Sequence, residues 1–254
     1  MKRPRDEVMY PRRGKGDPNI GPMAIVVAME EDLAVIRRAL GIDARRAWNI
    51  LSSKLYKGGC DHQDVALVGP LCGAPYAVMV VEKLIALGAE RIVFMGWCGS
   101  LQQDLPVGAI LVPDRAISEE GTSAHYPGGS SQLRPSGRLL EAIEEGLAEC
   151  AVPFQRGAVW TTDAPYRETR AKVVLFQGQG VLGVEMEVSA LFAAAAFRQI
   201  EMGALLVVSD DLSSLRWKPG FSSIAFKEAR KTAARVICAI CGKMTDFNVQ
   251  RIDP

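Results

Sequence analysis

Two glutamates flank a methionine where an apolar segment of the sequence ends. Glu185 and Glu187 stand on either side of Met186, directly after the small and apolar residues 182–184. A carboxylate can accept hydrogen bonds from two vicinal sugar hydroxyls, and a methionine offers an apolar surface to the sugar ring. The pattern is therefore interpreted as a reader of a sugar diol. It also suits a plain helix start, because the helix dipole favours acidic residues there.

A second acidic group follows another apolar segment. Ser209, Asp210 and Asp211 come directly after residues 205–208. A carboxyl group that is partly buried at the edge of a sheet holds its proton more tightly and can donate it to a leaving group. Asp210 is thus a candidate general acid, and the alternative is a helix N-cap beside a solvated neighbour.

The segments that must position these side chains alternate between two patterns. Short apolar runs rich in β-branched residues predict buried strands at 24–28, 65–68, 92–95, 109–112, 159–161, 182–184 and 205–208. Apolar residues at helical spacing predict helices at 31–40, 75–87, 136–147, 188–199 and 222–244. Strands that alternate with helices predict an α/β domain with a mostly parallel sheet covered on both faces.

In such folds, ligands bind at the carboxyl ends of the strands. The polar, Gly-rich and aromatic residues cluster in six loops at that edge: 28–32, 69–75, 96–105, 113–126, 161–170 and 209–220. Gly73 precedes a helix that Pro75 begins, an arrangement that recurs in anion sites, so Gly73 is a candidate phosphate ligand. Arg115 and Arg167, in two other loops, are the candidate cations for phosphate.

Composition narrows the class of protein. The chain has 254 residues, 48% hydrophobic and 23% charged, as expected of a globular protein, and no repeat or linker divides it. A net charge of +1 argues against nucleic-acid binding. The presence of only two histidines argues against a multi-His metal site, and neither a metal nor an organic cofactor is expected. Six scattered cysteines and the lack of an export signal or spanning segment indicate a reduced, cytoplasmic protein.

The first 22 residues differ from the rest. They are rich in Pro and Gly and carry six basic and three acidic side chains. Residues 1–22 are predicted to form an arm that is either solvated or packed against a neighbouring subunit, and residues 23–254 are predicted to form the single domain.

Several segments together resemble the nucleoside phosphorylase family, which includes purine nucleoside and uridine phosphorylases and the methylthioadenosine/adenosylhomocysteine nucleosidases. The resemblance rests on Glu-Met-Glu at 185–187 followed by Ser-Asp at 209–210, and the segments 96–101, 120–126 and 159–167 agree with it. It covers about residues 23–240. It implies one α/β domain around a twisted, mixed sheet flanked by helices, in a homo-oligomer such as a dimer or a trimer of dimers.

The resemblance also implies roles for individual residues. Glu187 hydrogen-bonds the ribose 2′ and 3′ hydroxyls beside Met186, and Asp210 protonates or hydrogen-bonds N7 of a departing purine. Inorganic phosphate is the co-substrate of a phosphorylase. The other substrate-binding positions in this sequence are Trp97, Cys98, Gly99, Thr162, Tyr166, Glu185 and Ser209.

The sequence departs from the family where phosphate binds. Phe94 stands where the phosphorylases have an arginine, and Trp97 where they have a serine or threonine. The loop 29–32 is acidic, which repels a phosphate dianion, and it is similar to the nucleosidases, whose water-activating glutamate corresponds to Asp32. Trp97 either stacks on the ligand or fills the pocket and blocks phosphate.

The sequence therefore predicts an enzyme that cleaves the N-glycosidic bond of a nucleoside, with a purine base, by phosphorolysis. The alternatives are a phosphate-independent nucleosidase, with Asp32 as a catalytic residue, and a non-catalytic nucleoside-binding protein on the same scaffold. The predicted partner is a small nucleoside rather than a nucleic acid or a membrane.

Overall fold

Four parallel strands form the centre of the sheet. The computed structural model describes residues 7–60, 63–128 and 133–243. In it β4 (Gln63–Gly69), β1 (Met23–Val27), β5 (Arg91–Ser100) and β9 (Glu201–Asp211) lie side by side in that order. All four contain predicted apolar runs, and every residue of β1 is buried, as expected of a strand with both faces covered. β5 and β9 extend several residues beyond their apolar runs, so Gly99 and Asp210 lie on strands rather than in loops.

The sheet closes on itself at one end. β9 also pairs with β6 (Ile110–Glu119), β6 with β7 (Phe154–Thr162), β7 with β8 (Gly183–Glu185), and β8 with β5. The β6–β9 and β5–β8 pairs are antiparallel, and the others in this ring are parallel. The predicted α/β fold with a mixed sheet flanked by helices is thus confirmed.

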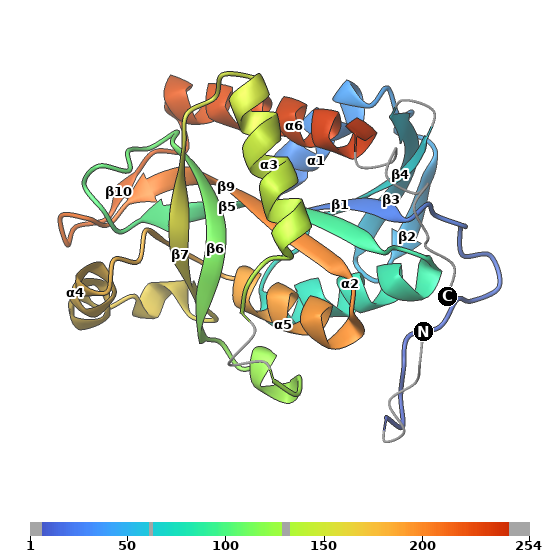
Figure 1. Ribbon diagram of the computed structural model, residues 1–254, viewed down its shortest axis with the longest axis horizontal. Coiled ribbons are helices and arrows are strands. Elements are labelled where there is room, and N and C mark those ends of the chain that lie inside the picture. Colours follow the sequence, from blue (N-terminus) through green and yellow to red (C-terminus); the bar gives the residue numbers. More distant parts are fainter. Residues whose placement is uncertain (1–6, 61–62, 129–132, 244–254) are drawn as a thin grey trace.

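Helices cover both faces of the sheet (Figure 1). α1 (Glu30–Ala39), α3 (Gly137–Glu149) and α6 (Ile224–Lys243) cover one face, and α2 (Ala74–Leu87) and α5 (Val188–Arg198) cover the other. Side chains of β1 alternate between the two resulting cores: Ala24 and Val26 pack with α2 and α5, and Ile25 and Val27 with α1 and α6. All five helices are among those that the sequence predicts.

Four further elements escape prediction from the sequence. They are β2 (Ala47–Ile50), β3 (Ser53–Cys60), α4 (Arg170–Gly178) and the short β10 (Lys218–Pro219). β2 exposes three of its four residues, so no apolar run marks it. α4 leaves Val174 and Leu175 more than half exposed, which obscures its apolar face. The 3-10 turns η1 (Ser123–His125) and η3 (Pro165–Arg167) complete the fold.

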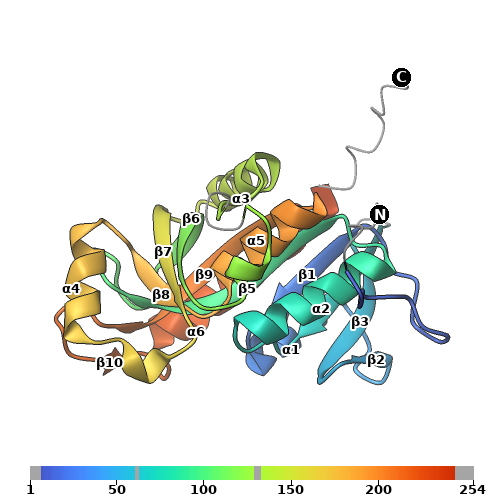
Figure 2. The same ribbon diagram turned by 90° about the horizontal axis from the view of Figure 1, so that it is seen from below.

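α4 and β10 lie together at the end of the molecule that is opposite β2 (Figure 2). A separate apolar cluster holds α4 against the ring, with Phe176 of α4 and Trp160 of β7 at a centroid distance of 4.6 Å. β8 lies at this end of the ring as well. α4 therefore supports the strand whose last residue, Glu185, begins the Glu-Met-Glu segment.

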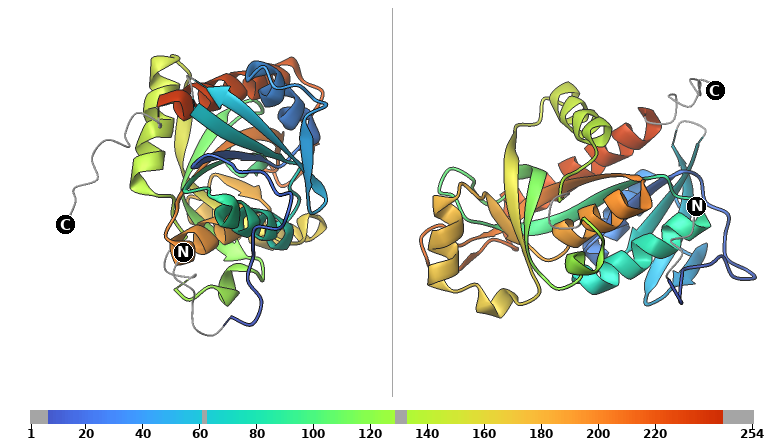
Figure 3. Two further views of the ribbon diagram at one scale, coloured as in Figure 1. Left: turned by 90° about the vertical axis from the view of Figure 1, so that its right-hand side faces the viewer. Right: turned by 60° about the horizontal axis from the view of Figure 1, so that its bottom comes forward.

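The arm packs against its own chain (Figure 3). The Arg13 guanidinium donates to the Leu87 carbonyl at 2.6 Å, and Lys83 of α2 donates to Asp17 at 2.6 Å. Ile20 is buried. Residues 7–22 therefore pack against α2 and cover part of its surface. Within the described residues, no helix is both long and apolar enough to cross a membrane.

Candidate active site

The carboxyl ends of β5, β8 and β9 border one cavity of about 620 Å³. Nine of the residues that the sequence selects line it: Trp97, Cys98, Gly99, Tyr166, Glu185, Met186, Glu187, Ser209 and Asp210. The polar part of the wall contains four carboxylates, those of Glu168, Glu185, Glu187 and Asp210. No arginine or lysine of the described chain lines this cavity.

Glu185 directs its carboxylate to the start of α5. One oxygen accepts the backbone N–H groups of Glu187 at 2.6 Å and Val188 at 2.7 Å, and the other accepts the hydroxyl of Thr161. These donors stabilise the buried charge and satisfy amides that the helix leaves unpaired. Glu185 is thus the cap that holds the Glu-Met-Glu segment at the cavity wall.

Glu187 binds the start of a second helix. The Gly73 N–H donates to its Oε1 at 2.6 Å, and Gly73 adopts a φ of 81°, which favours glycine. The predicted role of Gly73 as a phosphate ligand is not supported by this placement, because the anion at the amino end of α2 is the carboxylate of Glu187. Burial and the negative charge of Glu185 raise the pKa of Glu187.

Both oxygens of Asp210 accept hydrogen bonds. The hydroxyl of Ser209 donates to Oδ1 at 2.6 Å, and the indole N–H of Trp217 donates to Oδ2 at 2.9 Å. Gly99 of the neighbouring strand lies so close that a Cβ there would be 2.5 Å from Leu212 and 3.1 Å from Asp210. Asp210 therefore occupies a closely packed position that needs a glycine beside it.

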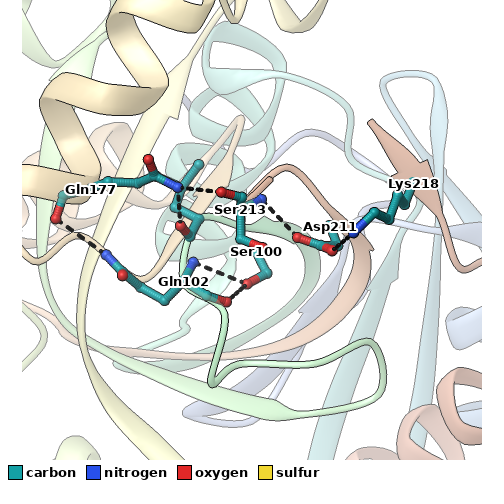
Figure 4. A network of polar contacts seen from close by, with 7 residues as sticks. Ser100, Gln102, Gln177, Asp211, Ser213 and Lys218 are labelled. Carbon is teal, nitrogen blue, oxygen red and sulfur yellow. Dashed lines mark hydrogen bonds and ion pairs between the residues drawn. The ribbon is translucent and has the colours of Figure 1, made fainter. Parts of the chain in front are cut away.

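A polar network fixes the segment that brings Trp217 to Asp210 (Figure 4). The amide nitrogen of Gln177 on α4 donates to the Ser213 carbonyl at 2.9 Å. Asp211 accepts the Ser213 N–H at 2.7 Å and the Lys218 ammonium at 3.2 Å. The segment between β9 and β10 is thus tied at both ends, which restricts where the indole can lie.

Trp97 forms part of the cavity wall on the side of α1 and α6. Its indole N–H donates to Asp32 Oδ2 at 2.6 Å, and the Arg230 guanidinium donates to Asp32 Oδ1 at 2.6 Å. Arg230 also lies over the indole ring, at 4.9 Å from its centroid. Burial raises the pKa of Asp32, while the charge of Arg230 and the two hydrogen bonds oppose that rise.

This arrangement corrects the prediction for Asp32. Asp32 is fully buried and does not line the cavity, and both of its oxygens are taken. It therefore positions Trp97 instead of activating a water molecule. Trp97 lies within β5 and its indole lines the cavity, which is compatible with both interpretations of this residue.

Three other predicted residues lie outside the cavity lining. Thr162 is buried and its hydroxyl accepts the Ala164 N–H at 3.2 Å, so it fixes the start of the loop that follows β7. Arg115 and Arg167 are exposed, and neither is among the lining residues. The prediction that they hold phosphate is therefore not supported within one chain.

Other residues of this wall carry no signal in the sequence, among them Glu168, Trp217 and Phe221. All three lie in loops that the strand-end rule selects or immediately after them, yet no motif marks them. In the described part of the chain, no group of three or more His, Cys, Asp or Glu side chains is arranged to hold a metal ion.

Comparison with known proteins agrees with this fold and cavity. Residues 22–244 match the family described as the phosphorylase superfamily. Guanosine phosphorylase of Halorubrum lacusprofundi is 29% identical over 63% of this chain and 66% of its own. Purine nucleoside phosphorylase DeoD-type 1 of Shewanella oneidensis is 28% identical over 67% of this chain and 73% of its own.

Solved structures show the same architecture. Uridine phosphorylase from Vibrio fischeri superposes with a TM-score of 0.79 at 21% identity and covers 88% of this chain and 93% of its own. Purine nucleoside phosphorylase from Toxoplasma gondii has a TM-score of 0.76 at 17% identity and covers 90% and 93%. The fold is thus that of the nucleoside phosphorylases. The chain belongs to the phosphorylase superfamily, a family of enzymes.

The contact between Arg230 and Asp32 should be a major contribution to stability. Arg230→Gln leaves the Asp32 carboxylate buried without a cation, and we expect it to lower the free energy of unfolding by about 3 kcal/mol at pH 7. Because the folded state of this variant binds the Asp32 proton more tightly than the unfolded state, stability should recover as the pH falls. Urea unfolding at pH 7 and pH 5 measures both effects.

The matched control is Arg45→Gln, which removes an ion pair with Asp43 whose two side chains are 90% and 41% exposed. That variant should unfold like the unmodified chain. If both variants lose the same small amount of stability, Asp32 does not depend on Arg230.

Proposed function

We propose that this chain cleaves the N-glycosidic bond of a purine nucleoside by phosphorolysis. The observation that carries the proposal is the shared cavity of Glu187 with Met186, at the end of β8, and Asp210, at the end of β9. β5 lies between these strands, so the two groups are separated by two strand spacings, about 10 Å. A nucleoside laid across Cys98 and Gly99 spans that distance, with its ribose at one carboxylate and its base at the other.

The purine preference rests on the base side of the cavity. A purine leaves more easily when its imidazole ring takes up a proton, and Asp210 is a carboxyl group at that position. As the C1′–N9 bond breaks, its electron pair moves to the base, the base takes up the proton, and an oxygen of the acceptor bonds to C1′. The names of the two curated relatives, which act on guanosine and purine nucleosides, support the same choice.

The acceptor of the ribosyl group is either phosphate or water. The part of the cavity that would hold it is where this chain differs most from a simple phosphorylase. The relatives are phosphorylases, which supports phosphate. Because no lysine or arginine of the described residues lines the cavity, the cation that holds phosphate in this proposal comes from a second copy of the chain. Hydrolysis is the second candidate, and it is favoured by the same carboxylate-rich wall and by the place of Trp97 in it.

The decisive experiment is base release by the purified chain with and without inorganic phosphate. Guanosine, inosine, adenosine and uridine are the substrates, and chromatography measures base and sugar products. We expect a purine base and ribose 1-phosphate only when phosphate is present, and little release from uridine.

Release of base and free ribose at the same rate without phosphate contradicts phosphorolysis and supports hydrolysis. Ligand binding without release at high protein concentration contradicts both reactions and supports the non-catalytic alternative. Release from uridine at the rate of the purine nucleosides contradicts the purine preference.

Glu187→Gln tests the placement of the ribose. Replacing the carboxylate by an amide weakens its bonds to the sugar hydroxyls, so kcat/KM for the ribonucleoside should fall about 10- to 100-fold. The 2′-deoxynucleoside offers one hydroxyl fewer and should lose less. Glu141→Gln, at an exposed position of α3, is the control and should change neither substrate. Equal losses on both sugars contradict the placement.

We also propose that the protein works in the cytoplasm as a homo-oligomer, a dimer or a trimer of dimers. The arm exposes Val8 and Met9, and α2, which the arm contacts, exposes Met79; exposed apolar side chains of this kind occur at interfaces. Cys72, Cys98 and Cys150 carry free thiols, which suits a reducing compartment. Ultracentrifugation should give an even multiple of 27.5 kDa, and a monomer at assay concentration contradicts the assembly.

A further inference from the structure

Trp217 is an aromatic residue of the cavity wall whose position burial explains only in part. It lies in the hairpin after β9, directly before β10. Its side chain lines the cavity, yet the residue remains 63% exposed. Because the hydrophobic gain is proportional to the apolar area removed from water, a tryptophan this exposed is held weakly by packing alone. A second interaction must fix the place of its indole.

That interaction is the hydrogen bond to Asp210. The indole N–H donates to Oδ2 at 2.9 Å, and the Ser209 hydroxyl donates to Oδ1 at 2.6 Å. The terminal torsion of an aspartate is broad, so a carboxyl group held at one oxygen can still rotate. Donors at both oxygens fix that rotation. Because an indole N–H donates and cannot accept, Trp217 orients the carboxyl group without competing for its proton.

The hairpin is shaped to make this contact. β10 pairs antiparallel with the end of β9, which returns the chain to Asp210. Gln177 of α4 donates to the Ser213 carbonyl in the turn (Figure 4). Leu215 has a φ of 59°, a left-handed conformation that leucine rarely adopts, and it packs against the apolar cluster that holds α4. Such a conformation persists where the surrounding contacts determine it, and here it directs Trp217 back to the cavity.

The ring of Trp217 has its own contact, separate from the N–H. Phe221 lies 6.4 Å from Trp217 and 6.0 Å from Trp97, measured between ring centroids, and all three side chains line the cavity. A phenylalanine at position 217 keeps an aromatic ring beside Phe221 and removes only the donor. The two contributions of this side chain can therefore be separated by substitution.

We propose that Trp217 is a positioning residue that holds the Asp210 carboxyl group in the orientation from which it serves N7 of the purine. The inference rests on the proposed cleavage of a purine nucleoside and holds for either acceptor. As the C1′–N9 bond breaks, its electron pair moves into the base, and the proton of the Asp210 carboxyl group passes to N7. Asp210 regains a proton from water after the base departs. Misplacement of the carboxyl group slows this step more than it weakens binding.

The test compares two substrates that differ in their need for a proton. The base of guanosine leaves with a proton on N7, whereas 7-methylguanosine already carries a positive charge on its imidazole ring. For Trp217→Phe, we expect kcat for guanosine to fall about 10-fold while its KM changes less than about twofold. kcat for 7-methylguanosine should change less than about twofold, because that base needs no proton.

Two further variants separate the donor from the ring. Trp217→Gln keeps an N–H donor and loses the ring, so the ratio of the two kcat values should stay within about threefold of the unmodified ratio. Trp48→Phe, on β2 and outside the cavity lining, makes the same change as Trp217→Phe at a position that is 37% exposed. It is the matched control and should alter neither substrate.

Nuclear magnetic resonance of the indole N–H groups tests the contact without reference to activity. The signal of Trp217 is the one that Trp217→Phe removes. Asp210→Asn should move that signal to higher field, because a neutral amide oxygen is a weaker acceptor than a carboxylate. The signal of Trp97, whose N–H donates to Asp32, should stay in place.

Equal losses on the two substrates in Trp217→Phe assign the residue to the cavity wall alone and overturn the inference. An unchanged guanosine kcat in that variant, or a Trp217 signal that Asp210→Asn does not move, overturns it as well. If the unmodified chain releases base from neither substrate, the proposed function fails and this role of Trp217 falls with it.

Discussion

The constraint on which this structure depends is the burial of several carboxylates around one cavity without a cation in its wall. Three of these carboxylates accept hydrogen bonds from the protein. Glu185 accepts amides at the start of α5, and Glu187 accepts one at the start of α2. Asp210 accepts a hydroxyl and an indole N–H. Burial still raises the pKa of Glu168, Glu185 and Glu187, so their ionised forms are costly in this cavity.

The ring of strands makes this arrangement possible. β8 and β9 both pair with β5, so the groups that follow them meet at one edge although they are distant in the sequence. Gly99 permits the close approach of Asp210 across that edge. α4 then supports the same end from outside, through its apolar contact with Trp160 and the polar tie to the segment after β9.

Arg230, a partly buried cation, lies behind the cavity wall rather than in it. Arg230 neutralises Asp32, and together they hold Trp97 at the end of β5. A wall of aromatic and acidic groups repels a phosphate dianion unless another chain brings positive charge. The described part of the chain brings no lysine or arginine of its own to this cavity.

The apolar runs of the sequence determined the central strands and the five covering helices, because periodic burial leaves a local pattern. The Glu-Met-Glu and Ser-Asp segments likewise determined most of the cavity. Only the tertiary structure decided which oxygen meets which donor: it placed Asp32 against Arg230, placed the Glu187 carboxylate at the amino end of α2, and brought Glu168 to the cavity wall. These outcomes depend on contacts between residues far apart in the chain, and side-chain type and spacing do not encode them.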